Sequence, residues 1–113
     1  MPLSRSARLV ACAAALAAPL LLGAAAPAPA AAVIKIDNFT FAPATVTAPA
    51  GTTVTWVNND DIPHAVAADD HSFKSRALDT GDRFSTTFAR PGTYSYFCSL
   101  HPHMTGKVVI TGR

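Results

Sequence analysis

Four side chains in this sequence have the types and the spacing of a metal site. Cys98, His101 and Met104 lie within one seven-residue run, CSLHPHM, and His64 lies well upstream. Together they supply one thiolate, two imidazoles and one thioether. Two histidines and a cysteine in a trigonal plane, with a long and weak axial methionine, form the ligand set of a blue-copper electron-transfer site. The sequence therefore predicts one type 1 copper ion bound by these four side chains.

The cysteine count supports a ligand role for Cys98. The chain has two cysteines, and Cys12 lies near the start of an apolar N-terminal run, where we interpret it as part of a targeting signal and not as a lipid-attachment site. Once that segment is removed, Cys98 has no partner for a disulfide. An unpaired cysteine in an exported protein indicates intermolecular pairing, a reactive thiol or a ligand, and the nearby His101 favours the ligand. A single cysteine also argues against a binuclear copper centre or a Cys₄ zinc site.

The N-terminal segment has the three parts of a secretory signal peptide. Arg5 and Arg8 give a positive start, residues 9–26 form an apolar run, and Ala28-Pro29-Ala30 offers a small-residue cleavage pattern. The alternative is a membrane anchor. That run is dominated by alanine, however, and its length is barely sufficient to span a bilayer.

The sequence thus divides into two parts. We predict a signal peptide over residues 1–30, with cleavage after Ala30 or after Ala32, and a single domain over residues 31–113. The domain would be periplasmic or otherwise extracytoplasmic. A chain of 113 residues holds at most one domain, and after removal of the signal we expect no stable membrane insertion.

The charge of residues 31–113 gives no support for a polyanionic partner. Seven Lys and Arg balance seven Asp there, so the formal net charge of this part is zero. No basic run or stripe is present, and we therefore expect no binding of nucleic acid. The acids cluster at Asp60-Asp61 and Asp69-Asp70, where they either steer a cationic partner or are solvated loop charges.

Short β-strands separated by turns account for the rest of the pattern. β-Branched and aromatic residues gather in runs bounded by Pro, Gly, Asn and Asp. The runs are residues 33–41, 45–47, 52–57, 64–68, 84–88, 93–98 and 107–111. This spacing predicts an all-β antiparallel sandwich or barrel, with a loop or a turn of helix over residues 69–78. Within its core, Trp56 should face Tyr94, Tyr96 or Phe97.

The predicted strands explain how a distant histidine reaches the local ligand run. Cys98 ends one strand and Met104 shortly precedes the last one, so these ligands share a hairpin-like loop. His64 begins another strand and can reach the same end of the sandwich. Pro63 and Pro102 stiffen the two ligand segments. A rigid cage that suits both oxidation states of copper needs little rearrangement on electron transfer.

These segments resemble the cupredoxins, the type 1 blue-copper proteins of the plastocyanin/azurin class. The resemblance is carried by GTTVTWVNND at residues 51–60, by Pro63-His64, by PGTYSYFC at residues 91–98 and by GKVVI at residues 106–110. Only two residues, Pro and His, separate the second histidine ligand from the methionine. A ligand loop of this length is similar to that of the amicyanins.

The resemblance implies a fold, a set of ligand atoms and an activity. The fold is a cupredoxin-like Greek-key β-sandwich of about seven to eight strands. His64 and His101 would bind copper through Nδ1, Cys98 through its thiolate and Met104 axially. The implied activity is the transfer of single electrons between larger redox partners by Cu(I)/Cu(II) cycling.

Two positions depart from the pattern that the resemblance suggests. Many cupredoxins have Asn after the first histidine, and its side chain helps to tie the two ligand loops together, but this chain has Ala65. The missing hydrogen bond is either absent or supplied from elsewhere, with Asn59 and Ser99 as candidates. Amicyanins usually have an aromatic residue where this chain has His103. That histidine is either an exposed rim residue, a competing ligand, or a pH-sensitive element of the docking surface.

Three classes of function fit such a site. The first is an electron carrier between a donor such as a dehydrogenase and an acceptor such as a cytochrome c. The second is a copper-binding protein for copper storage, delivery or resistance; mixed Cys, His and Met ligation favours the carrier. The third is an enzyme, which we do not expect because copper oxidases and nitrite reductases need a second copper site, and the sequence has no second ligand cluster.

His101 is the expected exit for electrons. With Leu100, Pro102, Pro63 and Ile62 it would form an apolar surface patch around an imidazole edge. Small, weak redox interfaces need brief docking and quick release, which such a patch with few charges permits. We therefore expect a monomer that docks its partners transiently near His101.

Overall fold

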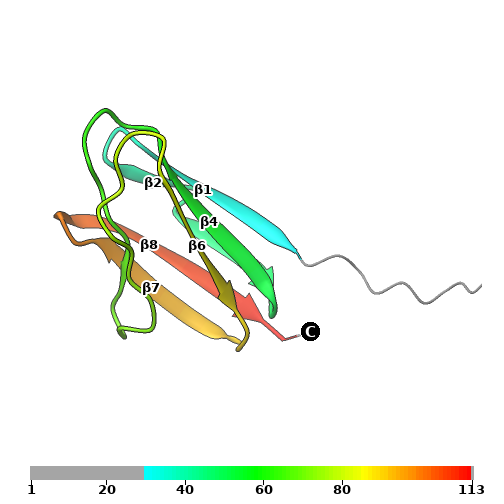
Figure 1. Cartoon of the computed structure of the whole chain (residues 1–113). Coiled ribbons are helices and arrows are strands. Elements are labelled where there is room, and N and C mark those ends of the chain that lie inside the picture. Colours follow the sequence, from blue (N-terminus) through cyan, green and yellow to red (C-terminus); the bar gives the residue numbers. More distant parts are fainter. Residues whose placement is uncertain (1–29, 113) are drawn as a thin grey trace, which may run out of the picture.

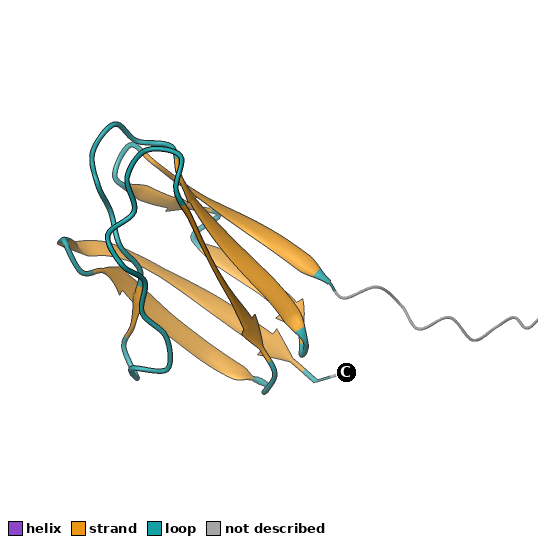
Figure 2. Cartoon of the chain, in the orientation of Figure 1, coloured by secondary structure: helices purple, strands orange, loops and turns teal. Residues whose placement is uncertain are grey.

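The computed structural model describes residues 30–112, which fold into two facing β-sheets connected by loops (Figure 1, Figure 2). The strands are β1 (Ala31–Asp37), β2 (Thr40–Ala42), β3 (Thr45–Pro49), β4 (Thr52–Asn58), β5 (Ala67–Ala68), β6 (Arg83–Phe88), β7 (Gly92–Cys98) and β8 (His101–Thr111). No helix occurs within this part of the chain. The predicted all-β sandwich of seven to eight strands is therefore confirmed.

The two sheets have four strands each, in the orders β2-β1-β4-β6 and β3-β8-β7-β5. Most neighbouring strands are antiparallel, but β1 runs parallel to β4 and β3 runs parallel to β8. The predicted antiparallel arrangement holds for most strand pairs but not for these two. Strand periodicity reports which face of a strand is buried, and it does not report the direction of the neighbouring strand.

Strand β4 shows why these residues form a sandwich. Along it, Thr52, Val54, Trp56 and Asn58 are buried, and the residues between them are half-buried. Alternate side chains of a strand point to opposite faces of its sheet, so the buried set faces β7 and β8 across the core. On the outer face the β4 hydroxyls pair with those of β6, at 2.8 Å for Thr53–Thr87 and 2.7 Å for Thr55–Ser85.

Aromatic side chains fill the core between the sheets. The Trp56 ring packs edge-on against Tyr96, with the ring centroids 5.3 Å apart, and lies 5.6 Å from Phe73. Of the three expected partners of Trp56, Tyr96 is confirmed. Tyr94 instead packs against Phe88 at 4.9 Å. These rings supply the apolar burial that a small domain without a disulfide in its described residues needs.

Two strand predictions were wrong in ways that affect the site. The expected strand over residues 33–41 is a hairpin, because the chain reverses at Asn38 and Phe39, whose φ angles are 51° and 58°. The expected strand over residues 64–68 is reduced to β5. His64 instead pairs through its backbone with Leu78, where each amide donates to the other's carbonyl at 3.1 and 2.7 Å.

The remaining segments agree better with expectation. Residues 69–78 form a loop with isolated bridges. The last strand is longer than predicted because β8 already begins at His101, and its pairing with β7 shifts register between Phe97 and Cys98. Among residues 30–112 no helix is long and apolar enough to span a bilayer.

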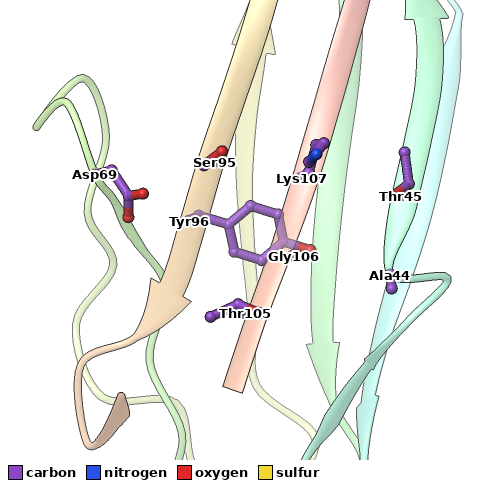
Figure 3. A pocket seen from close by; sticks show the side chains of 8 residues that line it. All are labelled: Ala44, Thr45, Asp69, Ser95, Tyr96, Thr105, Gly106 and Lys107. Atoms are coloured by element: carbon purple, nitrogen blue, oxygen red, sulfur yellow. The ribbon is translucent and has the colours of Figure 1, made fainter. Parts of the chain in front are cut away.

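Close packing between β7 and β8 requires a glycine at one position. Tyr96 lies directly across from Gly106, and its ring covers the Gly106 Cα (Figure 3). The Tyr96 hydroxyl is buried without a hydrogen-bond partner, and burial raises its pKa to about 12. Outside this pair lies a shallow cavity of about 360 Å³ that Asp69 and Lys107 also line. Position 106 can therefore hold no side chain without displacing the tyrosine.

Replacing this glycine tests the packing of Tyr96. Gly106→Ala would place a Cβ in steric overlap with the hydroxyl end of the Tyr96 ring, and overpacking of this kind costs about 1–3 kcal/mol of unfolding free energy. Urea unfolding of the metal-free protein measures the loss. Gly112→Ala is the matched control, because a Cβ there meets no atom within 4 Å. Equal stability of the two variants would contradict this packing.

Candidate metal centre

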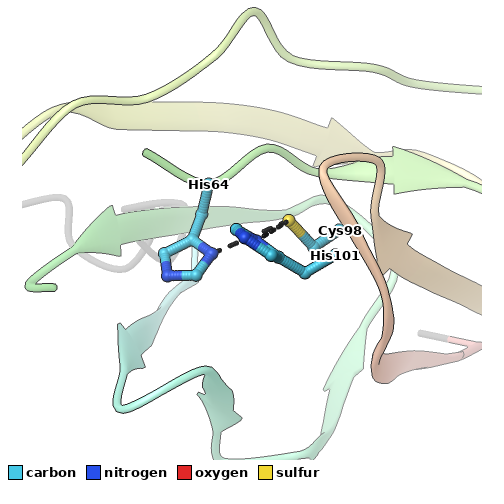
Figure 4. Close-up of side chains that lie close together, drawn as sticks. All are labelled: His64, Cys98 and His101. Atoms are coloured by element: carbon cyan, nitrogen blue, oxygen red, sulfur yellow. Dashed lines mark hydrogen bonds between the residues drawn. The ribbon is translucent and has the colours of Figure 1, made fainter. Parts of the chain in front are cut away.

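Three side chains that could bind a metal converge at one end of the sandwich (Figure 4). Cys98 ends β7, His101 begins β8, and His64 lies in the loop between β4 and β5. The Cys98 Sγ lies 3.7 Å from the Nδ1 of His64 and 3.7 Å from the Nδ1 of His101. The three donor atoms lie within 4.8 Å of one another. His64 and Cys98 are fully buried, whereas His101 is partly exposed.

These separations fit a single metal ion in a near-trigonal site. With a thiolate bond of roughly 2.3 Å, an imidazole bond of roughly 2.0 Å and an angle of about 120° between them, sulfur and nitrogen lie about 3.7 Å apart. Both observed sulfur–nitrogen distances have this value. Met104 is buried on β8 and lines the same surface depression as His101. The donor set, one thiolate, two imidazoles and one nearby thioether, suits copper.

Asp60 orients the buried histidine. Its Oδ2 accepts a hydrogen bond of 2.7 Å from the His64 Nε2. An ionised carboxylate only accepts, so the ring proton must lie on Nε2. The Nδ1 then presents its lone pair towards the Cys98 Sγ. A metal-binding histidine is commonly held in this way, with its second nitrogen donating to a carboxylate.

The Asp60 carboxylate is itself held by the β1–β2 turn. The backbone N–H groups of Phe39 and Asn38 donate to its two oxygens at 3.0 and 2.6 Å. The Phe39 N–H, with those of Asn38 and the His64 ring, lowers the pKa of Asp60 below its usual range, against the opposing effect of burial. The backbone carbonyl of Asp60 also accepts a hydrogen bond of 2.5 Å from the Thr80 hydroxyl.

The tie between the two ligand segments is supplied by the backbone. The Ala65 N–H lies 3.3 Å from the Cys98 Sγ and donates to it, which stabilises a thiolate. Asn58, buried at the end of β4, donates to the carbonyls of Ile62 and Leu78 at 2.9 and 2.8 Å. Asn59 and Ser99, which the sequence offered as replacements for the asparagine missing at Ala65, are both exposed. Asn58 instead holds the His64 segment in place.

The partly exposed His101 opens onto a depression of about 480 Å³. The lining residues are Phe39, Leu100, His101, Pro102, His103 and Met104. Leu100 and Pro102 flank the histidine as expected, and His103 is exposed at the rim. Pro63 is exposed but is not among the lining residues. The apolar surface at His101 is therefore completed by Phe39 of the β1–β2 turn.

Comparison with known proteins agrees with this geometry. A family model of the cupredoxin-like domain matches residues 9–110. Amicyanin from Paracoccus versutus is 38% identical over 83 residues, which cover 69% of this chain and 63% of that protein. Plastocyanin from Scenedesmus fuscus is 39% identical over 82 residues, which cover 63% of this chain and 84% of that protein.

Comparison with solved structures leads to the same class of proteins. A solved purple cupredoxin from Nitrosopumilus maritimus superposes with a TM-score of 0.69 at 37% identity, covering 71% of this chain and 99% of that one. The chain belongs to the cupredoxin family. Its match spans slightly less than two thirds of the Paracoccus amicyanin. The two curated relatives are an amicyanin and a plastocyanin, which agrees with the prediction that this cupredoxin is not an enzyme.

Sequence reasoning missed two residues that this cupredoxin places against the site. Asp60 was grouped with Asp61 as a charged loop, and its spacing from His64 carries no signal of its own in a segment that is not helical. Phe39 was assigned to the interior of a long strand. Asp37-Asn38 is a usable turn signal, but Phe39 is not, because a bulky residue seldom occupies a left-handed position. His71, which matches no motif position, is exposed in the loop after β5.

The Asp60 network predicts a specific loss of stability. Asp60→Asn replaces one acceptor oxygen by an amide that faces donor N–H groups, so the metal-free cupredoxin should lose about 1.5–3 kcal/mol. Chemical unfolding at neutral pH measures this loss. Asp61→Asn removes the same charge at the exposed neighbouring position and should change stability by less than about 0.5 kcal/mol. Similar losses in both variants would mean that charge, and not the hydrogen bonds, matters.

Proposed function

We propose that this cupredoxin is a type 1 (blue) copper protein that shuttles single electrons between larger redox partners. One copper ion would be held by His64, Cys98 and His101, with Met104 as the axial ligand. When bound, the ion supplies a one-electron Cu(I)/Cu(II) couple. The observation that carries the proposal is the pair of equal 3.7 Å distances from the Cys98 Sγ to the two histidine Nδ1 atoms.

The surroundings of these atoms support a carrier over a simple copper store. Cys98 lies at the end of a central strand of its sheet, and the His64 ring is fixed by Asp60. Such a cage holds its donor atoms in place before the metal arrives, so little rearrangement would accompany a change of oxidation state. A store or delivery protein gains nothing from such rigidity, because it must release its metal to an acceptor.

The chain's surface suggests where electrons would enter and leave. His101 joins the buried Cys98 to the depression, whose rim includes the exposed Leu100 and Phe39, each about half exposed. No acidic or basic residue lines this depression apart from the histidines. An apolar, uncharged surface of this size fits brief docking of a redox protein, such as a dehydrogenase as donor or a cytochrome c as acceptor. The protein would act as a monomer.

The location of this activity follows from the relatives and the N-terminus. Similarity to amicyanin supports the periplasm. The predicted signal peptide lies, except for its last residue, outside the described residues, and its cleavage after Ala30 or Ala32 stays a prediction.

Copper addition tests the carrier directly. The chain from residue 31 onwards, mixed with one equivalent of Cu(II), should give an intense thiolate-to-copper band and narrow copper hyperfine splitting in electron paramagnetic resonance. Cys98→Ser should abolish the band, because no thiolate remains among residues 31–113. A pale wild-type protein with ordinary tetragonal signals would favour copper storage, delivery or resistance instead.

The exposed ligand can be tested separately. His101→Gly should keep the fold but admit water or added imidazole to the metal, so its visible spectrum should change and respond to imidazole. His71→Gly is the matched control, because His71 is exposed, does not line the depression and has a φ of 67° that suits glycine. An unchanged spectrum in His101→Gly would remove this residue from the ligand set.

A further inference from the structure

Phe39 is an exposed aromatic residue on a strained backbone. Its φ is 58° and its side chain is 48% exposed. A bulky residue in the left-handed region is uncommon and costs conformational energy. The energetic cost of this backbone conformation is therefore not offset by burial of the Phe39 ring in the core. Such an outlier points to a functional constraint.

The turn that carries Phe39 is fastened to the candidate metal centre. The amides of Asn38 and Phe39 both donate to the Asp60 carboxylate, and that carboxylate also accepts from the His64 ring. Two successive left-handed residues aim their N–H groups at one anion, which offsets the strain of the turn. The position of the Phe39 ring is thus tied to the position of a proposed copper ligand.

The ring lies against both imidazoles at once. Its centroid is 5.3 Å from that of His64 and 5.2 Å from that of His101, both in edge-to-face geometry. The two histidine rings are 4.9 Å apart. Edge-to-face aromatic contacts are attractive. Phe39 also lines the depression onto which His101 opens.

We propose that Phe39 is a positioning residue that closes the exposed side of the metal centre. Its ring holds the His101 imidazole in its binding orientation and keeps small ligands in solution from reaching the metal. The proposal rests on copper binding at this site, as proposed above. His101 needs this support most, since His64 and Cys98 are fully buried and are held by Asp60 and Ala65.

The backbone conformation provides an unusually clean variant. Phe39→Gly removes the ring and at the same time relieves the left-handed strain, so the turn and its two hydrogen bonds to Asp60 should persist. Asn38→Gly relieves the same kind of strain one residue earlier, at φ 51°, and leaves the ring in place. It is the matched control. Phe39→Tyr keeps an aromatic ring at the position and should restore wild-type behaviour.

The first measurement uses the metal-free protein. Side-chain nuclear magnetic resonance relaxation at one fixed pH should show a single, ordered His101 ring in the wild type and in Asn38→Gly. In Phe39→Gly the ring signals should broaden through exchange, while those of His64 stay sharp because Asp60 still holds that ring. An equally ordered His101 in Phe39→Gly would overturn the positioning role.

The second measurement uses the copper-loaded protein and azide as the external ligand. Azide can reach the metal only if the Phe39 ring moves off the two imidazoles, so loss of the ring should tighten azide binding to Cu(II) by about tenfold, the cost of breaking two aromatic contacts. Asn38→Gly and Phe39→Tyr should stay within about twofold of the wild type. If all variants bind azide alike while the wild type is blue, only the shielding role fails. A wild type that is not blue would contradict the proposed function itself.

Discussion

The hydrogen bond between Asp60 and His64 is the constraint on which the candidate site depends. It lies where three parts of the chain meet: the β1–β2 turn, the end of β4 and the loop that carries the first histidine. The carboxylate gathers donors from the turn and from the ring. Because it can only accept, it sets the tautomer that leaves His64 Nδ1 free to bind a metal. The backbone of the β1–β2 turn, which contains no ligand atom, thereby determines which nitrogen of His64 is free to bind a metal.

The ligand loop could be predicted from the sequence because its information is local. The cysteine, the second histidine and the methionine lie close together in the chain, and strand β7 fixes where they start. His64 could be predicted only together with the strand pattern, since an isolated histidine carries little signal. The geometry brings His64, Cys98 and His101 together, as that pattern suggested. The aromatic partner of Trp56 was predictable for the same reason: alternation along β4 and β7 indicates which rings face inwards.

The features that sequence reasoning missed depend on long-range pairing or on unusual backbone. The parallel pairs β1–β4 and β3–β8 arise from crossovers that periodicity does not report. The turn at Asn38 and Phe39 has two positive φ angles but contains no glycine, the residue that usually indicates them. Asp60 and Asp61 are identical in type, and only the folded chain shows that the Asp60 carboxylate accepts three hydrogen bonds while Asp61 is exposed. In each case, the deciding interaction joins segments that are distant in the sequence.

The connection between β7 and β8 explains why the short ligand loop matters. Cys98 and His101 are direct cross-strand partners, and the next pair is Phe97 with Thr105. Residues 102–104 are therefore extra on the β8 side and form an irregularity in the ladder. Such a bulge re-aims side chains beside it, and here Met104 is buried while Pro102 and His103 remain exposed. The regular pairing resumes at Thr105, so these three extra residues set where Met104 lies relative to Cys98 and His101. The length of this loop, and not only its residue types, thus determines which side chains can surround a metal.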